Sequence, residues 1–126
     1  MGKVIIVPMH TFETMDTKET RNTFCHLLEV ILNNAPQKSN TETFLAHAIK
    51  GKLDELKQSV RLAAVSNGGT IPFALEDSEY EFVKGGLAYL RGLDRIQGDM
   101  WYYIVKPLAE AKDEQEQKKE IETHKV

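Results

Sequence analysis

The sequence has few of the residues that crosslink, target or anchor a protein. Cys25 is the single cysteine among 126 residues, so the chain cannot form an internal disulfide, which is consistent with a reducing compartment. The apolar run Val4–Val7 ends at Pro8 and is too short for a signal-peptide core or a membrane span. These absences predict a cytoplasmic protein that does not bind a membrane.

Basic charge is also scarce. The 16 Lys and Arg residues are outnumbered by 19 Asp and Glu residues, which gives a formal net charge of −3 and a pI of about 5.8. Nucleic acids and anionic membranes select basic surfaces, so neither is expected as a partner. The apolar fraction of 41% and the charged fraction of 28% are typical of a globular protein.

Length and composition predict one compact domain over residues 1–111. Residues 112–126, KDEQEQKKEIETHKV, contain only two apolar side chains, Ile121 and Val126. Burial of so little apolar surface cannot offset the entropy of ordering the segment. We therefore expect a charged tail that is flexible or forms a frayed helix.

Hydrophobic periodicity predicts a mainly α fold of about four helices. The first helix is expected to begin at the acidic cap Asp16–Glu19 and to end at Asn33–Pro36. Its apolar face follows the helical spacing i, i+3, i+4, i+7 and consists of Phe24, Leu27, Leu28 and Ile31.

A second helix is predicted from about Thr41 to Ser66, with Asn67-Gly68-Gly69 as a left-handed stop. Apolar residues spaced 4, 3, 4 and 3 form a short heptad-like seam, which consists of Ile49, Leu53, Leu56, Val60 and Ala63. Packing within the chain is the preferred interpretation of this seam. Self-association, for example as a homodimer, is the alternative.

Two further helices are expected between residues 77 and 108. Ser78–Glu81 reads as a capping box for the third helix, which ends near Gly92. The pair Gly85-Gly86 inside it indicates either close contact with a neighbouring helix or a break. Asp99 can cap the fourth helix, and Pro107 is expected to open a final helix as its first residue.

The β content is expected to be small. Lys3 to Met9, KVIIVPM, is a β-branched run that predicts a short N-terminal strand. Its best partner is Thr70 to Leu75, TIPFAL, in which Pro72 restricts the strand to a sheet edge. Together they predict a two-stranded ribbon.

The histidines and the cysteine offer no catalytic or metal-binding pattern. Cys25 and His26 are adjacent on a helix, where side chains diverge by about 100°, so they cannot act as a nucleophile and base. We expect Cys25 to be buried and His26 to lie at the surface or boundary, and His47 to be a satisfied side chain at the rim of the core. The sequence predicts no catalytic residue, no cofactor and no metal ligand.

The acidic run from Glu76 to Glu81 has a structural and a functional interpretation. Carboxylates at a helix start are stabilised by the free N–H groups and the helix dipole. The alternative is a cation site or an acidic contact patch, and Glu79 is the candidate partner-binding residue.

The triplet Trp101-Tyr102-Tyr103 is the main candidate for partner binding. Three consecutive large aromatics on a helix cannot all face one small core, and Trp and Tyr frequently dominate interfaces. The preferred interpretation is nevertheless that Trp101 is in the core and both tyrosines are half-buried, with their hydroxyls hydrogen-bonded. A contact surface or a self-association patch is the alternative.

The segments TRNTFCHLLEVILNNAP, LEDSEYEFVKGGL and GDMWYYIVKPLAE together resemble a loose family of small, helical, uncharacterised bacteriophage proteins. The resemblance covers about residues 3 to 110, and the chain departs from it at Gly85-Gly86 and in its charged tail. It implies a phage or prophage origin, and so the host cell cytoplasm, but it carries over no activity and no site residue.

Three functional classes follow. The favoured one is a non-enzymatic accessory protein that binds a host or phage protein as a regulator or inhibitor. The second is a homo-oligomeric assembly factor, supported by the heptad-like seam. The third is a small-ligand-binding protein or minor enzyme, which needs a pocket lined by His47, Tyr80 and Trp101.

Overall fold

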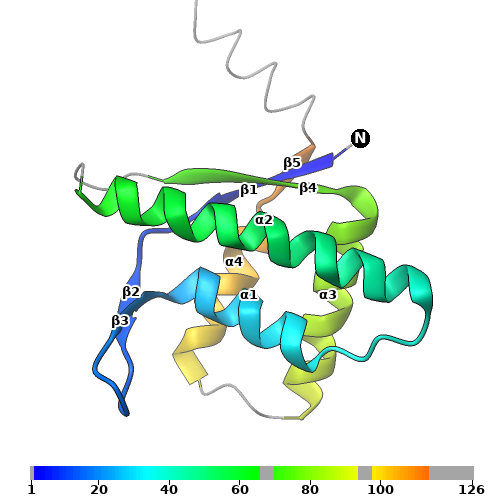
Figure 1. Cartoon of the computed structure of the whole chain (residues 1–126), viewed down its shortest axis with the longest axis horizontal. Helices are drawn as coiled ribbons and strands as arrows, with labels where there is room; N and C mark the ends of the chain where they lie inside the picture. The colour runs from blue at the N-terminus through cyan, green and yellow to red at the C-terminus, as the bar shows by residue number, and fades with distance from the viewer. Residues whose placement is uncertain (1, 66–69, 94–97, 114–126) are drawn as a thin grey trace, which may run out of the picture.

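The computed structural model describes residues 2–65, 70–93 and 98–113, and these residues form a mainly α fold with a minor β part (Figure 1). The helices are α1 (Thr23–Asn34), α2 (Asn40–Val65), α3 (Asp77–Gly92) and α4 (Tyr102–Ala109), the last preceded by the 3-10 turn η1 (Gly98–Trp101). The strands are β1 (Gly2–Val7), β2 (Thr11–Glu13), β3 (Thr20–Asn22), β4 (Ile71–Glu76) and β5 (Lys112–Asp113). The predicted fold class is confirmed.

The predicted pairing of the N-terminal strand is correct. β1 and β4 are antiparallel, and the strand order β4-β1-β5 places β4 at an edge, where Pro72 lies opposite Ile6. Residues 112 and 113 differ from the expected tail, because they form β5 and Asp113 pairs with Lys3 at 2.7 Å. The rest of the predicted tail, residues 114–126, lies outside the described residues.

The predicted start of the first helix is wrong. Asp16–Glu19 forms the turn of the β2–β3 hairpin, where the backbone of Thr14 bonds both Lys18 and Glu19. The side chain of Asn22 caps α1 instead, since its Oδ1 accepts the N–H of Cys25 at 3.0 Å. Its amide also donates to the carbonyl of Pro8, so one residue begins the helix and ties it to the preceding strand.

Helix α1 is the centre of the core and packs against α2, α3 and α4 (Figure 1). Apolar residues cover more than one side of α1, so the helix can be buried between several neighbouring helices at once. The buried set includes the four residues predicted from periodicity, and it consists of Thr23, Phe24, Cys25, Leu27, Leu28, Ile31 and Leu32.

Helix α2 uses its seam within the chain. Ile49, Leu53, Leu56 and Val60 are buried in the main hydrophobic cluster, and α2 packs against α1, α3 and β4. The side chain of Ala63 and the predicted stop at Asn67-Gly68-Gly69 lie outside the described residues. Intramolecular packing therefore accounts for the described part of the seam, which removes it as an argument for self-association.

Helix α3 begins two residues earlier than the predicted capping box. Glu76 is the N-cap, and the carboxylate of Glu79 accepts its N–H at 2.8 Å, so Ser78 and Glu81 do not form the box. Of the pair Gly85-Gly86, only Gly86 makes the predicted close contact with a neighbouring helix. A Cβ on Gly86 would lie 2.7 Å from Cγ2 of Ile31, whereas a Cβ on Gly85 would meet nothing within 4 Å.

The predicted role of Pro107 is wrong, because it lies inside α4 and is buried there. The helix still forms because Pro107 costs only one donor, while Ile104 and Leu108 anchor the segment in the core at 0% and 3% exposure. Burial of these side chains offsets the loss of the hydrogen bond that Pro107 cannot donate. Asp99 does not cap α4 as predicted, because it lies inside the 3-10 turn η1, which leads directly into α4.

Candidate functional site

The three aromatic side chains of the predicted binding segment, Trp101-Tyr102-Tyr103, differ in burial and in the residues they contact. Trp101 is partly buried and packs against the core, whereas the side chain of Tyr102 is 55% exposed. Tyr103 is half-buried and stacks on the ring of His10, with ring centroids 3.8 Å apart. Only Tyr102 offers most of its surface to a partner, while Trp101 and Tyr103 have structural contacts.

Glu79 does not belong to a contact patch. Its side chain is buried, and its carboxylate both caps α3 and forms an ion pair with Lys52 of α2. Its partners satisfy a charge that would otherwise be costly to bury. Glu79 therefore joins two helices within the fold and is not a surface residue that a partner can reach.

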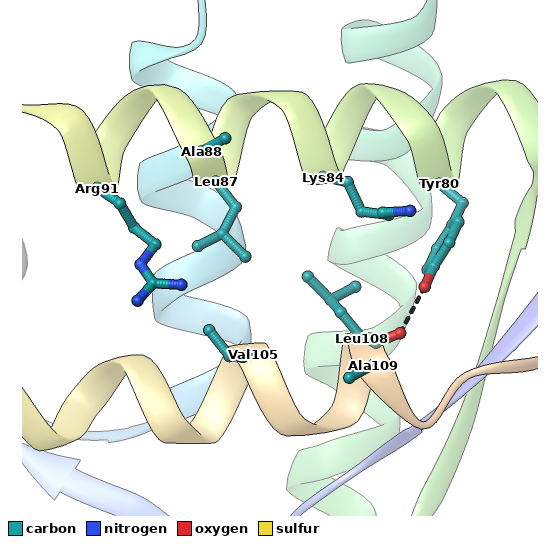
Figure 2. A pocket seen from close by; sticks show the side chains of 8 residues that line it. All are labelled: Tyr80, Lys84, Leu87, Ala88, Arg91, Val105, Leu108 and Ala109. Carbon is teal, nitrogen blue, oxygen red and sulfur yellow. Dashed lines mark hydrogen bonds between the residues drawn. The ribbon is translucent and has the colours of Figure 1, made fainter.

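A groove of about 560 Å³ lies between α3 and α4 (Figure 2). Its lining is apolar in the middle, where Leu87 of α3 faces Val105 and Leu108 of α4. The complete lining also includes small residues that leave the space open, and it consists of Tyr80, Lys84, Leu87, Ala88, Arg91, Val105, Leu108 and Ala109. We call this space the α3–α4 groove.

The groove has a fixed geometry at its Tyr80 end. The Tyr80 hydroxyl donates a hydrogen bond to the carbonyl of Leu108, which holds α3 and α4 together (Figure 2). Lys84 lies 5.2 Å from the centre of the Tyr80 ring. At the other end, the guanidinium of Arg91 lies 5.6 Å from the Trp101 ring. Both charged residues of the lining are thus cations positioned by aromatic rings.

Tyr102 lies beside this groove. It is one helical turn before Val105 and Lys106, and two turns before Ala109, so these residues form one stripe on α4. Lys106 donates a hydrogen bond of 3.0 Å to the Tyr102 hydroxyl, and this bond is the main cause that raises the pKa of Lys106. Tyr102 therefore precedes the groove residues Val105 and Ala109 on the same stripe of α4, although it is not part of the groove lining.

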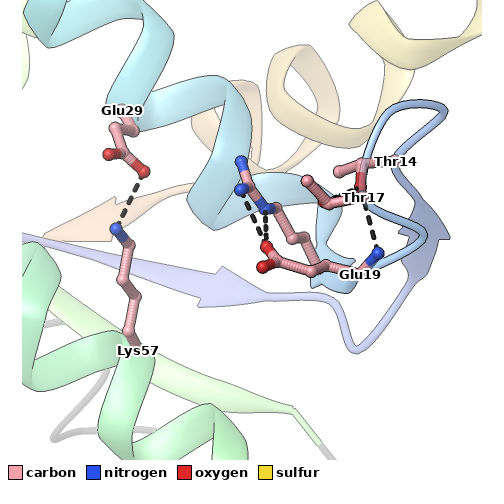
Figure 3. A network of polar contacts seen from close by, with 6 residues as sticks. Thr14, Thr17, Glu19, Glu29 and Lys57 are labelled. Atoms are coloured by element: carbon pink, nitrogen blue, oxygen red, sulfur yellow. Dashed lines mark hydrogen bonds and ion pairs between the residues drawn. The ribbon is translucent and has the colours of Figure 1, made fainter.

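A second hollow, of about 660 Å³, lies between the β2–β3 hairpin, α1 and α2. It is polar, and two ion pairs occupy its walls: Lys57 with Glu29 at 2.8 Å and Arg21 with Glu19 at 2.9 Å (Figure 3). The hydrogen bond from Lys57 lowers the pKa of Glu29, although burial opposes this shift. These four groups satisfy one another, and the lining also includes the exposed cation Arg61.

Cys25 and His26 also line this second hollow, but neither is activated. Burial raises the pKa of the Cys25 thiol to about 11, so the thiol is protonated at neutral pH and is a poor nucleophile. Burial, helped by the charge of Arg21, lowers the pKa of His26, whose ring packs edge-on against Phe12. The predicted burial of Cys25 and boundary position of His26 are confirmed.

The pocket required by the third functional class does not form in either hollow. Tyr80 lines the α3–α4 groove, but Trp101 is outside its lining and His47 is an exposed residue of α2. Among the residues that the structure describes, no group of three His, Cys, Asp or Glu side chains could hold a metal ion. None of the described helices combines the length and apolar character needed to cross a membrane.

The α3–α4 groove has no signature in the amino-acid sequence. Leu87, Val105 and Leu108 are ordinary apolar residues at helical spacing, and Lys84 and Arg91 carry no pattern that singles them out. Comparison with protein-family models, with curated proteins and with solved structures found no match. The geometry of the chain is therefore the basis of its functional interpretation, and the resemblance to bacteriophage proteins stays a prediction.

Proposed function

We propose that the protein is a non-enzymatic accessory protein that binds another protein through the α3–α4 groove and the adjacent Tyr102. The observation that carries this proposal is an apolar groove whose two ends each hold a cation beside an aromatic ring. Aromatic and Arg side chains around an apolar centre are the composition that most often dominates protein interfaces. The resemblance noted above makes a host or phage protein the expected partner, and regulation or inhibition the expected outcome.

A protein partner suits this surface better than a small molecule. Small-ligand sites combine an enclosed apolar cavity with a few convergent polar groups. The middle of the α3–α4 groove has only aliphatic side chains, and its charges lie at the two ends (Figure 2). Such a surface can hold the apolar side of a protein segment while its ends contact charged groups.

The proposal can be tested by capturing a partner protein from host extract with the wild type and with a variant whose groove is filled by a larger side chain. Ala88 is exposed and lines the groove, so Ala88→Trp should occupy the space without disturbing the core. Ala48 is exposed on α2, away from the groove lining, and Ala48→Trp is the matched control. The captured protein should be retained by the wild type and by Ala48→Trp, and lost from Ala88→Trp.

Two results would contradict the proposal. The first is equal capture by both tryptophan variants, which would place binding on another surface. The second is a large homo-oligomer in light scattering with no captured protein, which would favour the assembly-factor alternative. Far-UV circular dichroism of each variant verifies that Ala88→Trp is folded.

A further inference from the structure

The α3–α4 groove also indicates the chemistry of its occupant, an inference that rests on the proposed function. We infer that the groove binds an acidic amphipathic helix with two carboxylates seven residues apart and an apolar side chain on the turn between them. The two cations of the groove, Lys84 and Arg91, are themselves seven positions apart on α3. At 1.5 Å per residue, this spacing separates their backbone positions by about 10 Å along the helix.

Charge complementarity determines the sign of the partner. The groove lining contains two charged residues, and both are cations. Arg91 lies beside Trp101, and Lys84 has only a long contact of 3.6 Å with Glu81, an exposed pair that contributes little. Both cations can therefore accept carboxylates from a partner without breaking a strong ion pair.

The walls of the groove determine the conformation of the partner. Both walls are helices, whose backbone groups are bonded within each helix. An extended peptide would find no strand edge here for main-chain hydrogen bonds. A helix satisfies its own backbone, and its side chains at i, i+3, i+4 and i+7 lie on one face, with carboxylates at i and i+7 about 10 Å apart.

The apolar contact falls between the two cations. Leu87 lies between Lys84 and Arg91 on α3 and faces Val105 of α4 (Figure 2). Ala88 and Ala109, which also line the groove, have short side chains. An apolar side chain at i+3 or i+4 of the partner helix would therefore reach the middle of the groove while its carboxylates reach the ends.

The probe is a synthetic, fluorescently labelled helical peptide with Glu at i and i+7 and Leu at i+3 and i+4. We expect saturable binding to the full chain in fluorescence anisotropy, weakened by added salt because the ion pairs are exposed. Lys84→Glu with Arg91→Glu should weaken binding by about tenfold or more, since two attractions become repulsions. Lys38→Glu with Lys50→Glu makes the same charge change on exposed residues outside the groove and should leave binding unchanged.

A second peptide, with Lys in place of both Glu residues, tests whether reversing the charges on both partners restores binding. It should bind the Lys84→Glu, Arg91→Glu variant better than the wild type, which a merely unfolded variant could not do. Absence of saturable binding up to about 1 mM would overturn the inference. Equal binding by Ala88→Trp, displacement of the probe by a peptide of residues 114–126, or a groove-dependent dimer in light scattering would also overturn it.

The two proposals fail in different ways. If Ala88→Trp abolishes partner capture from extract but the charge reversal does not, the groove binds a protein of another chemistry. In that case the proposed function stands and the acidic helix is excluded. If neither change affects capture, both proposals fall.

Discussion

Individual side chains divide into those that hold the fold together and those that are free to bind. Tyr102 and Tyr103 are neighbours in sequence, yet one ring is exposed and the other stacks on His10. His10 in turn hydrogen-bonds the hydroxyl of Thr23 at 2.7 Å, so Tyr103 helps to connect α4 with the start of α1. Simultaneous replacement of both tyrosines would therefore mix a structural effect with a binding effect.

Single substitutions separate these effects. Tyr103→Ala should lower the free energy of unfolding by about 1–3 kcal/mol, because it removes a half-buried ring and its stacking partner. Tyr102→Ala should change it by less than about 1 kcal/mol, because the side chain is mostly exposed. Urea unfolding followed by circular dichroism measures both values. Equal losses in the two variants would show that Tyr102 is also part of the fold.

The Cys25 thiol offers a second residue-scale prediction. Its pKa of about 11 in the fold exceeds the ordinary value of 9.0, so the fold favours the protonated thiol. This contribution to stability is fully present below about pH 9 and is lost as the pH rises toward about 11. The free energy of unfolding of the wild type should therefore fall more steeply over this range than that of Cys25→Ala.

Thiol reactivity provides an independent check on the same residue. Cys25 is 4% exposed, so a thiol-directed disulfide reagent should react slowly with the folded protein at pH 8 and fully after unfolding in urea. Equally fast reaction in both conditions would contradict the burial and the raised pKa. The Cys25→Ala variant gives the background signal.

At the scale of elements, the contact between α1 and α3 depends on one glycine of the adjacent pair. An added Cβ on Gly86 would lie 2.7 Å from Cγ2 of Ile31 and 3.1 Å from Cβ of Ala35, and both of these residues are buried. The Cβ of Ala35 is fixed by its backbone and cannot rotate away. The two helices can approach this closely only because position 86 lacks a side chain.

Replacement of glycine by alanine is predicted to have opposite effects on stability at the two positions of the pair Gly85-Gly86. Gly86→Ala should destabilise the protein by about 1–3 kcal/mol, because overpacking outweighs the gain in helix propensity. Gly85→Ala should stabilise it by about 0.5–1 kcal/mol, since nothing lies within 4 Å of the added methyl group. Thermal or urea unfolding of both variants tests this contrast. Stabilisation by Gly86→Ala would show that α1 and α3 can move apart at little cost.

The periodic part of the fold could be predicted from the sequence. The existence of the four helices, the face of α1 and the edge position of Pro72 follow from local spacing and from the missing N–H of proline. The helix starts were less predictable. The residue types of Asp16–Glu19 are typical of a helix cap, but they are equally typical of a hairpin turn, which is what they form here. Strands of three residues, such as β2 and β3, are too short to show a period.

The candidate site could be predicted only in part. Tyr102 was named from its residue type, and it does lie beside the groove. The groove depends on how α3 and α4 are placed by the Tyr80–Leu108 hydrogen bond, a contact between residues 28 positions apart. Glu79 was misassigned because its partner Lys52 is 27 positions away, and no local pattern shows that contact.

At the scale of the whole molecule, the core and the α3–α4 groove share residues of α3 and α4. α1 and the seam of α2 are buried in the core, and so are three residues that also line the groove, Tyr80, Leu87 and Leu108. The exposed part of the groove lining consists of Lys84, Ala88, Arg91 and Ala109. The core residues in the groove lining are mostly buried, while the exposed residues of the lining remain accessible to a partner. A partner can therefore bind there while the packing of α1 and α2 stays unchanged.

The most direct test of partner binding through the α3–α4 groove is hydroxyl-radical footprinting of the protein alone and in complex with its captured partner. Three exposed side chains report on separate regions: Tyr102 beside the groove at 55% exposure, Phe44 on α2 at 72% and Met15 in the hairpin turn at 97%. Binding through the groove predicts that oxidation of Tyr102 falls severalfold while Phe44 and Met15 keep their rates. Unchanged oxidation of Tyr102 with protection of Phe44 or Met15 would contradict it.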